Sequence, residues 1–135
     1  MSRIIWGEKY DVNVKRINEE HQRLFAMIND LYDSMNLGKG QDIIGKIIEG
    51  LLDYTKFHFK TEEDIMLKIT YPDYAKHKQQ HDVFVKNVTD FQDKFKKGAI
   101  LLSLEVLKFL EDWLINHICK MDKAYTTFFN RNGIY

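Results

Sequence analysis

Apolar residues recur along most of the chain in alternating steps of four and three, the spacing of one face of an α-helix. Four segments carry such a stripe. Its positions are Ile17, His21, Leu24, Ile28, Leu31 and Met35 in the first segment; Ile44, Ile47, Leu51, Thr55, His58, Glu62 and Ile65 in the second; Tyr74, His77, His81, Phe84, Val88, Phe91 and Phe95 in the third; and Leu102, Val106, Leu110, Trp113 and His117 in the fourth. The pattern predicts an all-α protein.

Capping residues and glycines set the expected ends of the first helix. It should begin near Ile17, with Asn18 as its cap, or Asn13 if it starts earlier. Gly38 and Gly40 should end it, because glycine is the residue that most readily adopts the conformation beyond a helix terminus.

The other helices are bounded by similar signals. Asp42 is a candidate cap for the second helix, and Pro72 marks the break before the third, where proline is tolerated in the first turn. The third helix should close at Lys96, Lys97 and Gly98, with cations at its carboxyl end. The fourth should run from about Leu101 to Lys120.

Short connections between helices of similar length predict an up-down-up-down antiparallel four-helix bundle. Residues 1–14 have no helical period, and Trp6, Tyr10 and Val12 suggest an N-terminal arm laid across the domain surface. Residues 123–135 should form a short C-terminal helix or an ordered cap. Without a repeat or a linker, residues 1–135 are expected to be a single domain.

Composition narrows the class of protein further. The 135 residues are 44% apolar and 30% charged, with 20 basic and 20 acidic residues, so no bulk charge favours nucleic acid or an anionic membrane as partner. No apolar run could span a bilayer, and charge interrupts the amino terminus too early for a signal peptide. We therefore expect a cytoplasmic protein without membrane insertion. The single cysteine, Cys119, agrees with a reducing compartment.

The distribution of histidine is the strongest chemical signal. All five histidines fall on the predicted inward stripes, which would happen by chance roughly once in five hundred if such positions are two in seven. One inward histidine is usually a satisfied core residue, but five together need a common cause. Two carboxylates lie within about one and a half helical turns of a histidine: Glu62 is four residues after His58, and Asp122 is five residues after His117.

Burying several imidazoles and two carboxylates without partners would cost several kcal/mol per charged group. A protonated network would leave His77 and His81 without a matching acid, whereas metal cations would satisfy both charge and lone pairs. The candidate ligands are His21, His58, Glu62, His77, His81, His117 and Asp122. Seven ligands exceed the four of a structural zinc site, and two metal ions are the simplest interpretation.

Counting the ligands available to two metal ions predicts that one ion has an unoccupied coordination position. If Glu62 and Asp122 both bridge the ions, together with a solvent oxygen, the five imidazoles divide into three and two. One ion is then six-coordinate, and the other keeps a vacancy for a small diatomic molecule. Such a site suits iron, although manganese, zinc and copper also fit the spacing.

Four motifs support a resemblance to a known family. They are Glu20-His21-Gln22-Arg23-Leu24-Phe25, His58-Phe59-Lys60-Thr61-Glu62-Glu63, His77-Lys78-Gln79-Gln80-His81, and Trp113-Leu114-Ile115-Asn116-His117-Ile118 followed by Asp122. From Trp6 to about Tyr125 the chain resembles the hemerythrin family in its single-domain bacterial form. The resemblance implies a four-helix bundle around a non-haem di-iron centre, oxo- or hydroxo-bridged, that binds dioxygen reversibly for storage, delivery or sensing.

The resemblance also implies residue roles. By motif, His77, His81 and His117 would hold the closed iron, and His21 and His58 the open one, while Glu62 and Asp122 would bridge. The oxygen pocket would be shaped by Phe59, Trp113, Leu114 and Ile118. Position alone favours ordinary core packing for these residues over a role in an oxygen pocket.

Three functions are compatible with this site. The first is an oxygen-binding protein that is not an enzyme, with dioxygen as ligand and an oxygen-consuming enzyme as a candidate partner. The second is a di-iron oxidase or peroxidase, although carboxylate-rich bundle enzymes use more glutamate and fewer histidines. The third is a structural metal bundle or metal store. Stable, oxygen-dependent colour would distinguish the first from the others.

Overall fold

Helices dominate the part of the chain that the structure describes, residues 3–98 and 104–135 of a computed structural model. In chain order they are η1 (Glu8–Tyr10), α1 (Lys15–Asn36), α2 (Gln41–Lys68), α3 (Tyr74–Lys96), α4 (Leu104–Asn116), a π-helical segment (His117–Asp122) and α5 (Lys123–Arg131). The described residues contain no strand, which confirms the predicted all-α class.

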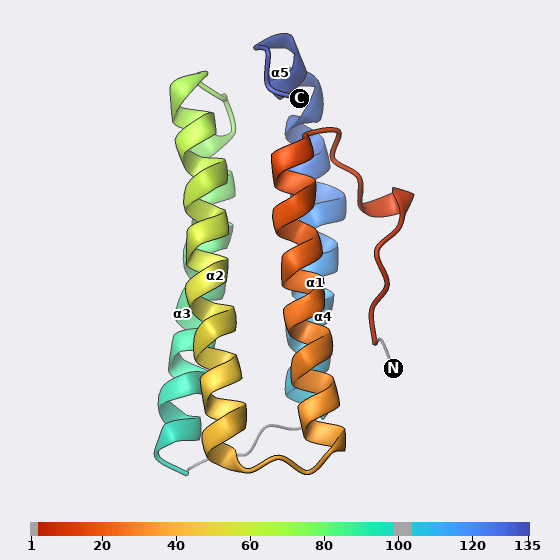
Figure 1. The fold of residues 1–135 in the computed structure, drawn as a ribbon. Coiled ribbons are helices and arrows are strands. Elements are labelled where there is room, and N and C mark those ends of the chain that lie inside the picture. The colour runs from red at the N-terminus through yellow and green to blue at the C-terminus, as the bar shows by residue number, and fades with distance from the viewer. Residues whose placement is uncertain (1–2, 99–103) are drawn as a thin grey trace.

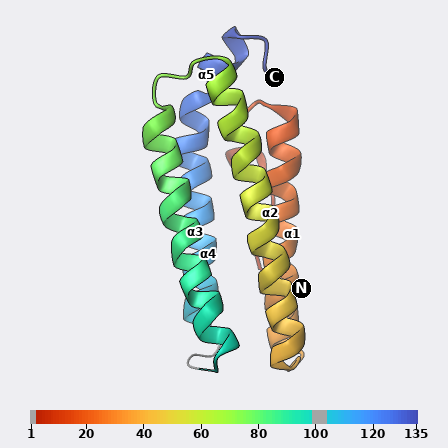
Figure 2. The ribbon, with the colours of Figure 1, turned by 90° about the vertical axis from the view of Figure 1, so that its left-hand side faces the viewer.

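The long helices run antiparallel to their neighbours in sequence (Figure 1). Helix α1 packs against α2, α2 packs against α3, and α1 also contacts α4. The view turned by 90° shows α3 beside α4 on the opposite side of the bundle from α1 and α2 (Figure 2). The up-down-up-down four-helix bundle predicted from the short connections is therefore confirmed.

The predicted side-chain caps were wrong. Val14 stands at the N-cap of α1 without a side-chain cap, and Gly40 does so for α2. Asn18 instead accepts a hydrogen bond from the Val12 amide (3.0 Å) and donates one to Asp11 (2.7 Å), so its side chain ties down the segment before the helix. Asp42 lies within the first turn of α2, where a carboxylate still interacts favourably with the helix dipole.

Glycine ends α1 and α3 as predicted. Gly38 and Gly98 have φ angles of +68° and +73°, a region that residues with a Cβ seldom adopt. Pro72 lies ahead of α3, which begins at Tyr74, so the proline breaks the chain without entering the helix. The expected start of the fourth helix at Leu101, and its inward Leu102, lie outside the described residues.

The fourth helix departs from the predicted end at Lys120. Its α-helical part stops at Asn116, six π-helical residues follow, and the chain continues directly into α5. The expected short C-terminal helix is thus present as α5, which lies beyond the end of the four-helix bundle (Figure 1).

The N-terminal arm is partly a core element. Tyr10 and Val12 are only 4% and 0% exposed, so the arm does more than lie on the surface. Thr126 donates a hydrogen bond of 2.7 Å to the Val12 carbonyl, which fastens the arm to α5. The interior of the bundle is apolar around Leu31, Ile48 and Leu107, and it becomes polar nearer α5. Within the described ranges, no helix combines the length and apolar character needed to cross a membrane.

Candidate metal centre

Seven buried side chains converge where the bundle interior becomes polar. They are His21 from α1, His58 and Glu62 from α2, His77 and His81 from α3, and His117 and Asp122 from the π-helical segment. None is more than 4% exposed. The structure therefore brings together every residue that the sequence predicted as a metal ligand.

These side chains form two groups that share two members. One group is Glu62, His77, His81, His117 and Asp122, and the other is His21, His58, Glu62 and Asp122. Within each group the potential ligand atoms all lie within 4.8 Å of one another. Glu62 and Asp122 belong to both groups, so each carboxylate lies between three histidines on one side and two on the other.

Helical spacing places the residues contributed by α2 and α3. His58 and Glu62 are one turn apart, with Nε2 and Oε1 separated by 3.2 Å. His77 and His81 are also one turn apart, and their ring centroids are 4.6 Å apart. On both helices the four-residue step puts the pair on the face that points into the bundle.

The π-helical segment explains the unusual spacing of His117 and Asp122. Five residues along a straight α-helix would rotate the second side chain by about 140° from the first, away from the centre. A π-helix carries more residues per turn, and such segments often occur at functional sites. The segment brings Asp122 Oδ1 within 3.1 Å of His117 Nε2. The hydrophobic period could not reveal this extra residue.

The two oxygens of Asp122 face different groups of histidines. Oδ1 lies 3.0 Å from His77 Nε2, and Oδ2 lies 3.0 Å from His21 Nε2. Glu62 Oε1 also reaches both groups, at 3.2 Å from His58 Nε2 and 3.4 Å from His81 Nε2. Both carboxylates thus have the placement that a bridging ligand requires.

Partners outside the centre orient three of the histidines. The Nδ1 atoms of His58 and His81 lie 2.7 Å from Glu20 and 2.8 Å from Glu63, so each N–H donates to a carboxylate. His117 Nδ1 faces the Gln80 side chain at 3.3 Å. In each neutral ring the lone pair is then on Nε2, directed at the centre.

These outer partners were missed from the sequence as functional residues. The conclusion that His77 and His81 lack a matching acid was wrong, because Glu63 pairs with His81. A histidine ligand needs a partner for its second nitrogen, which is the signal that could have found Glu63 and Glu20. Which acid pairs with which ring depends on helix packing: Glu20 bonds His58 on α2 rather than its neighbour His21.

Tyr125 is a further contact that sequence spacing did not indicate. Its hydroxyl donates a hydrogen bond of 2.6 Å to Glu62 Oε2, and its ring stacks on Phe129 with centroids 4.0 Å apart. Burial and the nearby Glu62 charge raise the pKa of this phenol well above 10, which keeps it protonated. Tyr125 therefore acts as a fixed donor to one carboxylate of the centre.

Burial and the neighbouring charges shift the pKa values of several side chains in the centre. Although burial disfavours a charged ring, the Glu62 charge and the hydrogen bond to Glu20 raise the pKa of His58 to about 10. Burial likewise disfavours ionised Asp122, yet His117 lowers the pKa of this carboxyl well below its usual range. The pKa of His21 is lowered, mainly by burial, so this ring is neutral.

A pH dependence follows for the protein prepared without metal. Because the pKa of His58 rises from 6.5 to about 10 on folding, its stabilising protonation is fully present below pH 6.5 and is lost as the pH rises through about 10. We expect the free energy of unfolding to fall over this window by on the order of a few kcal/mol. Denaturant unfolding at increasing pH measures it. A flat profile would contradict the assigned shift.

The donor set fits metal cations. Four of the buried atoms that face the centre make no well-aligned hydrogen bond with the described residues: His21 Nε2, Glu62 Oε1, and Oδ1 and Oδ2 of Asp122. The Nε2 atoms of His77 and His81 each lie 3.0 Å from His117 Nε2. Lone pairs that face one another at this distance repel unless a proton or cation lies between them. Imidazole nitrogens with carboxylate oxygens are ligands that iron accepts.

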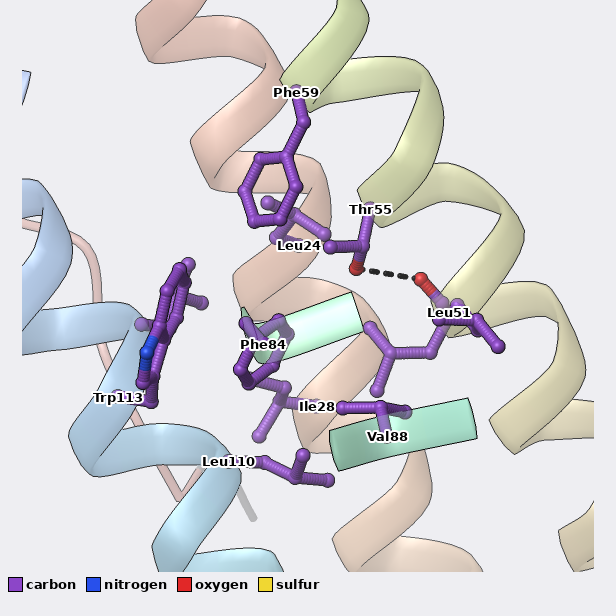
Figure 3. A pocket seen from close by; sticks show the side chains of 11 residues that line it. Leu24, Ile28, Leu51, Thr55, Phe59, Phe84, Val88, Leu110 and Trp113 are labelled. Atoms are coloured by element: carbon purple, nitrogen blue, oxygen red, sulfur yellow. Dashed lines mark hydrogen bonds between the residues drawn. The ribbon is translucent and has the colours of Figure 1, made fainter. Parts of the chain in front are cut away.

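The interior of the bundle contains a small apolar cavity (Figure 3). It offers about 20 Å³ to the centre of a water-sized molecule, and its lining is Leu24, Ile28, Leu51, Leu52, Thr55, Phe59, Phe84, Val88, Leu110, Trp113 and Leu114. Thr55 donates its hydroxyl hydrogen to the Leu51 carbonyl at 2.7 Å, so its polar group is satisfied within α2. The space is therefore large enough for a diatomic molecule and offers few groups that would hold water.

Three of the predicted oxygen-pocket residues line this cavity, namely Phe59, Trp113 and Leu114. Phe59 stacks on His81 with centroids 3.7 Å apart, and Trp113 stacks on His117 at 4.6 Å. The cavity wall is thus continuous with the histidine cluster. Ile118 is fully buried but does not belong to the described lining.

Comparison with known proteins gives a consistent answer. A family model described as the hemerythrin HHE cation binding domain matches residues 12–128. The bacteriohemerythrin of Methylococcus capsulatus is 38% identical over 93% of this chain and 95% of its own. That of Stenotrophomonas maltophilia is 33% identical over 93% of this chain and 80% of its own.

Solved structures agree with the sequence relatives. A crystal structure of wild-type hemerythrin superposes with a TM-score of 0.89 at 37% identity, covering 93% of this chain and 96% of the other. Fold and site together define a helical-bundle protein with a buried, histidine-rich metal centre. The chain belongs to the hemerythrin family. It binds dioxygen reversibly at a non-haem di-iron centre, as the motifs predicted.

Proposed function

We propose that the two groups of side chains each hold one iron ion. His77, His81 and His117 would hold one, His21 and His58 the other, and Glu62 and Asp122 would bridge them. The observation that supports this division is the placement of the two carboxylates between three histidines and two. The ion with fewer protein ligands would then have a coordination position left for dioxygen.

The protein's own residues then have distinct tasks. When bound, the iron pair supplies the electrons and the open coordination position that oxygen binding requires. Glu20 and Glu63 hold the rings of His58 and His81 in one orientation through their Nδ1 hydrogens. Phe59 and Trp113 cover the histidines and keep water away, which preserves the reduced, oxygen-binding state.

We propose storage, delivery or sensing of oxygen as the role, and no enzymatic activity. The cavity beside the centre leaves about 20 Å³ for the centre of a water-sized molecule, which is too little for an organic substrate. An oxygen-consuming enzyme is the proposed recipient. The balanced charge and the composition support a cytoplasmic protein in which residues 1–135 form one hemerythrin-like domain.

The His58→Ala variant tests the ligand division. We expect it to lose the iron of the two-histidine group and to retain the other, because the remaining ligands of that group include only one imidazole. Metal analysis should give about one iron per chain, and the oxygen-dependent visible band should disappear.

A surface substitution two residues away serves as the matched control. Lys56 is exposed on the same helix, and Lys56→Ala should retain the full iron content and the band. A normal oxygen spectrum in the His58→Ala protein would show that the division of ligands is wrong.

Leu114→Tyr tests the cavity. The larger side chain would fill it and bring a hydroxyl beside the centre, where a buried hydroxyl requires a partner and favours entry of water. We expect iron content near that of the parent but faster loss of the oxygen-dependent band in air. Asn116→Tyr adds the same ring at an exposed position of α4 and should leave this rate unchanged. Equal rates in the two variants would show that the cavity does not control how fast the oxygen-dependent band is lost.

A further inference from the structure

The five histidines of the centre are not equally supported from outside. Glu20, Glu63 and Gln80 face the Nδ1 atoms of His58, His81 and His117 at 2.7, 2.8 and 3.3 Å. Such outer contacts fix a ligand ring and strengthen metal binding. Three histidines therefore have a polar side chain that holds them in place.

His21 has no such support. Its ring is fully buried, its Nε2 faces Asp122 Oδ2 within the centre at 3.0 Å, and its Nδ1 has no hydrogen-bond partner among the residues that the structure describes. The ring instead rests on aromatic neighbours: the His58 ring at 4.6 Å between centroids and the Trp6 ring at 6.5 Å. Of these, Trp6 is the one that comes from outside the centre.

Trp6 belongs to the N-terminal arm, which packs along one stripe of α1. His21, Phe25 and Asn29 follow one another at four-residue steps on that helix. Trp6 packs edge-on against Phe25, with centroids 5.4 Å apart, and Tyr10 of the arm also packs edge-on against Phe25, at 4.9 Å. The arm thus covers the turn of α1 that carries the histidine.

Specific hydrogen bonds fix the start of the arm on this stripe. Asn29 Oδ1 accepts hydrogen bonds from the Arg3 and Ile4 amides at 2.8 and 2.9 Å. Asn29 Nδ2 donates to the Ile4 carbonyl at 2.9 Å. Arg3 also forms an ion pair with buried Glu111 of α4, with Nε and Oε1 2.6 Å apart. Asn29 therefore holds the backbone of the two residues that lie three and two positions before Trp6.

We propose that Trp6 is a positioning residue for His21, and that the arm, fixed by Asn29, determines how firmly the two-histidine side of the centre retains its metal ion. The inference rests on the ligand division proposed above. It assigns to the arm a selective effect on one of two ions, rather than general stabilisation of the bundle.

The test is the release of ferrous iron from the anaerobic, iron-loaded protein to a coloured chelator. In the Asn29→Ala protein one ion per chain should leave about tenfold faster than in the parent, while the other leaves at the parental rate. Hydrogen exchange at the Ile4 amide should accelerate in the same variant, which verifies that the arm has been released.

Two comparisons separate positioning from folding. Trp6→Ala should accelerate release of the same ion, and Trp6→Phe, which keeps a ring against Phe25, should restore most of the parental rate. Asn132 makes a side-chain hydrogen bond to a carbonyl in α5, away from the arm, so Asn132→Ala is the matched control and should release both ions normally.

Faster release of one ion in Asn29→Ala and Trp6→Ala supports the proposal. Unchanged release, or equal acceleration of both ions, overturns it while leaving the ligand division intact. A parent protein that binds only one ion would instead overturn the ligand division itself.

Discussion

The Glu62→Gln variant is expected to lose most of its iron from both positions. Glu62 belongs to both groups of side chains, and its Oε1 lies 3.2 Å from His58 and 3.4 Å from His81. The amide keeps the shape of the side chain but removes the negative charge that both cations require. We expect well under one iron per chain, roughly a hundredfold loss of metal affinity, and no oxygen-dependent visible band.

A second glutamate of α2 provides the control for that experiment. Glu49 is exposed, and Glu49→Gln makes the same chemical change away from the centre. It should bind iron and oxygen as the parent does. If Glu62→Gln retained two iron ions per chain, a bridging role for Glu62 would be excluded.

Removal of iron is expected to destabilise the fold substantially. Without cations, Glu62 and Asp122 are ionised, 0% exposed, and left with unpaired oxygen atoms. Uncompensated buried charge of this kind costs about 3–5 kcal/mol. Protonation of His58 compensates for part of it near neutral pH, because the pKa of that ring is raised to about 10 in the absence of metal. We expect a clearly lower melting temperature for the metal-free protein.

Differential scanning calorimetry of the iron-loaded and metal-free proteins measures this effect. The difference should widen at high pH, where His58 loses the proton that compensates for the missing cations. Equal melting temperatures at every pH would show that the centre does not contribute to folding stability.

The fold and the metal ligands could be predicted because both follow the helical repeat of about 3.6 residues. Apolar residues and histidines share the same helical stripe, so the pattern that indicates a bundle also indicates what points into it. Pairs such as His58 with Glu62 need only the four-residue step of a regular helix. This is why local spacing was sufficient for α1, α2 and α3.

Features that depend on irregular backbone or on packing could not be predicted. The π-helical residues His117–Asp122 break the helical period, and only the structure shows how Asp122 turns into the centre. Outer partners such as Glu20 lie on a different helix from the histidine that they support. The predicted caps failed for a related reason, since Asn18 is engaged by the arm.

The central claim is that two iron ions share one buried centre and leave one position for oxygen. The most direct measurement is an anaerobic titration of the reduced protein with dioxygen, followed by its visible spectrum and combined with metal analysis. We expect about two irons and one dioxygen per chain, with a band that disappears on deoxygenation. One iron per chain, or oxygen consumption without a reversible band, would contradict it.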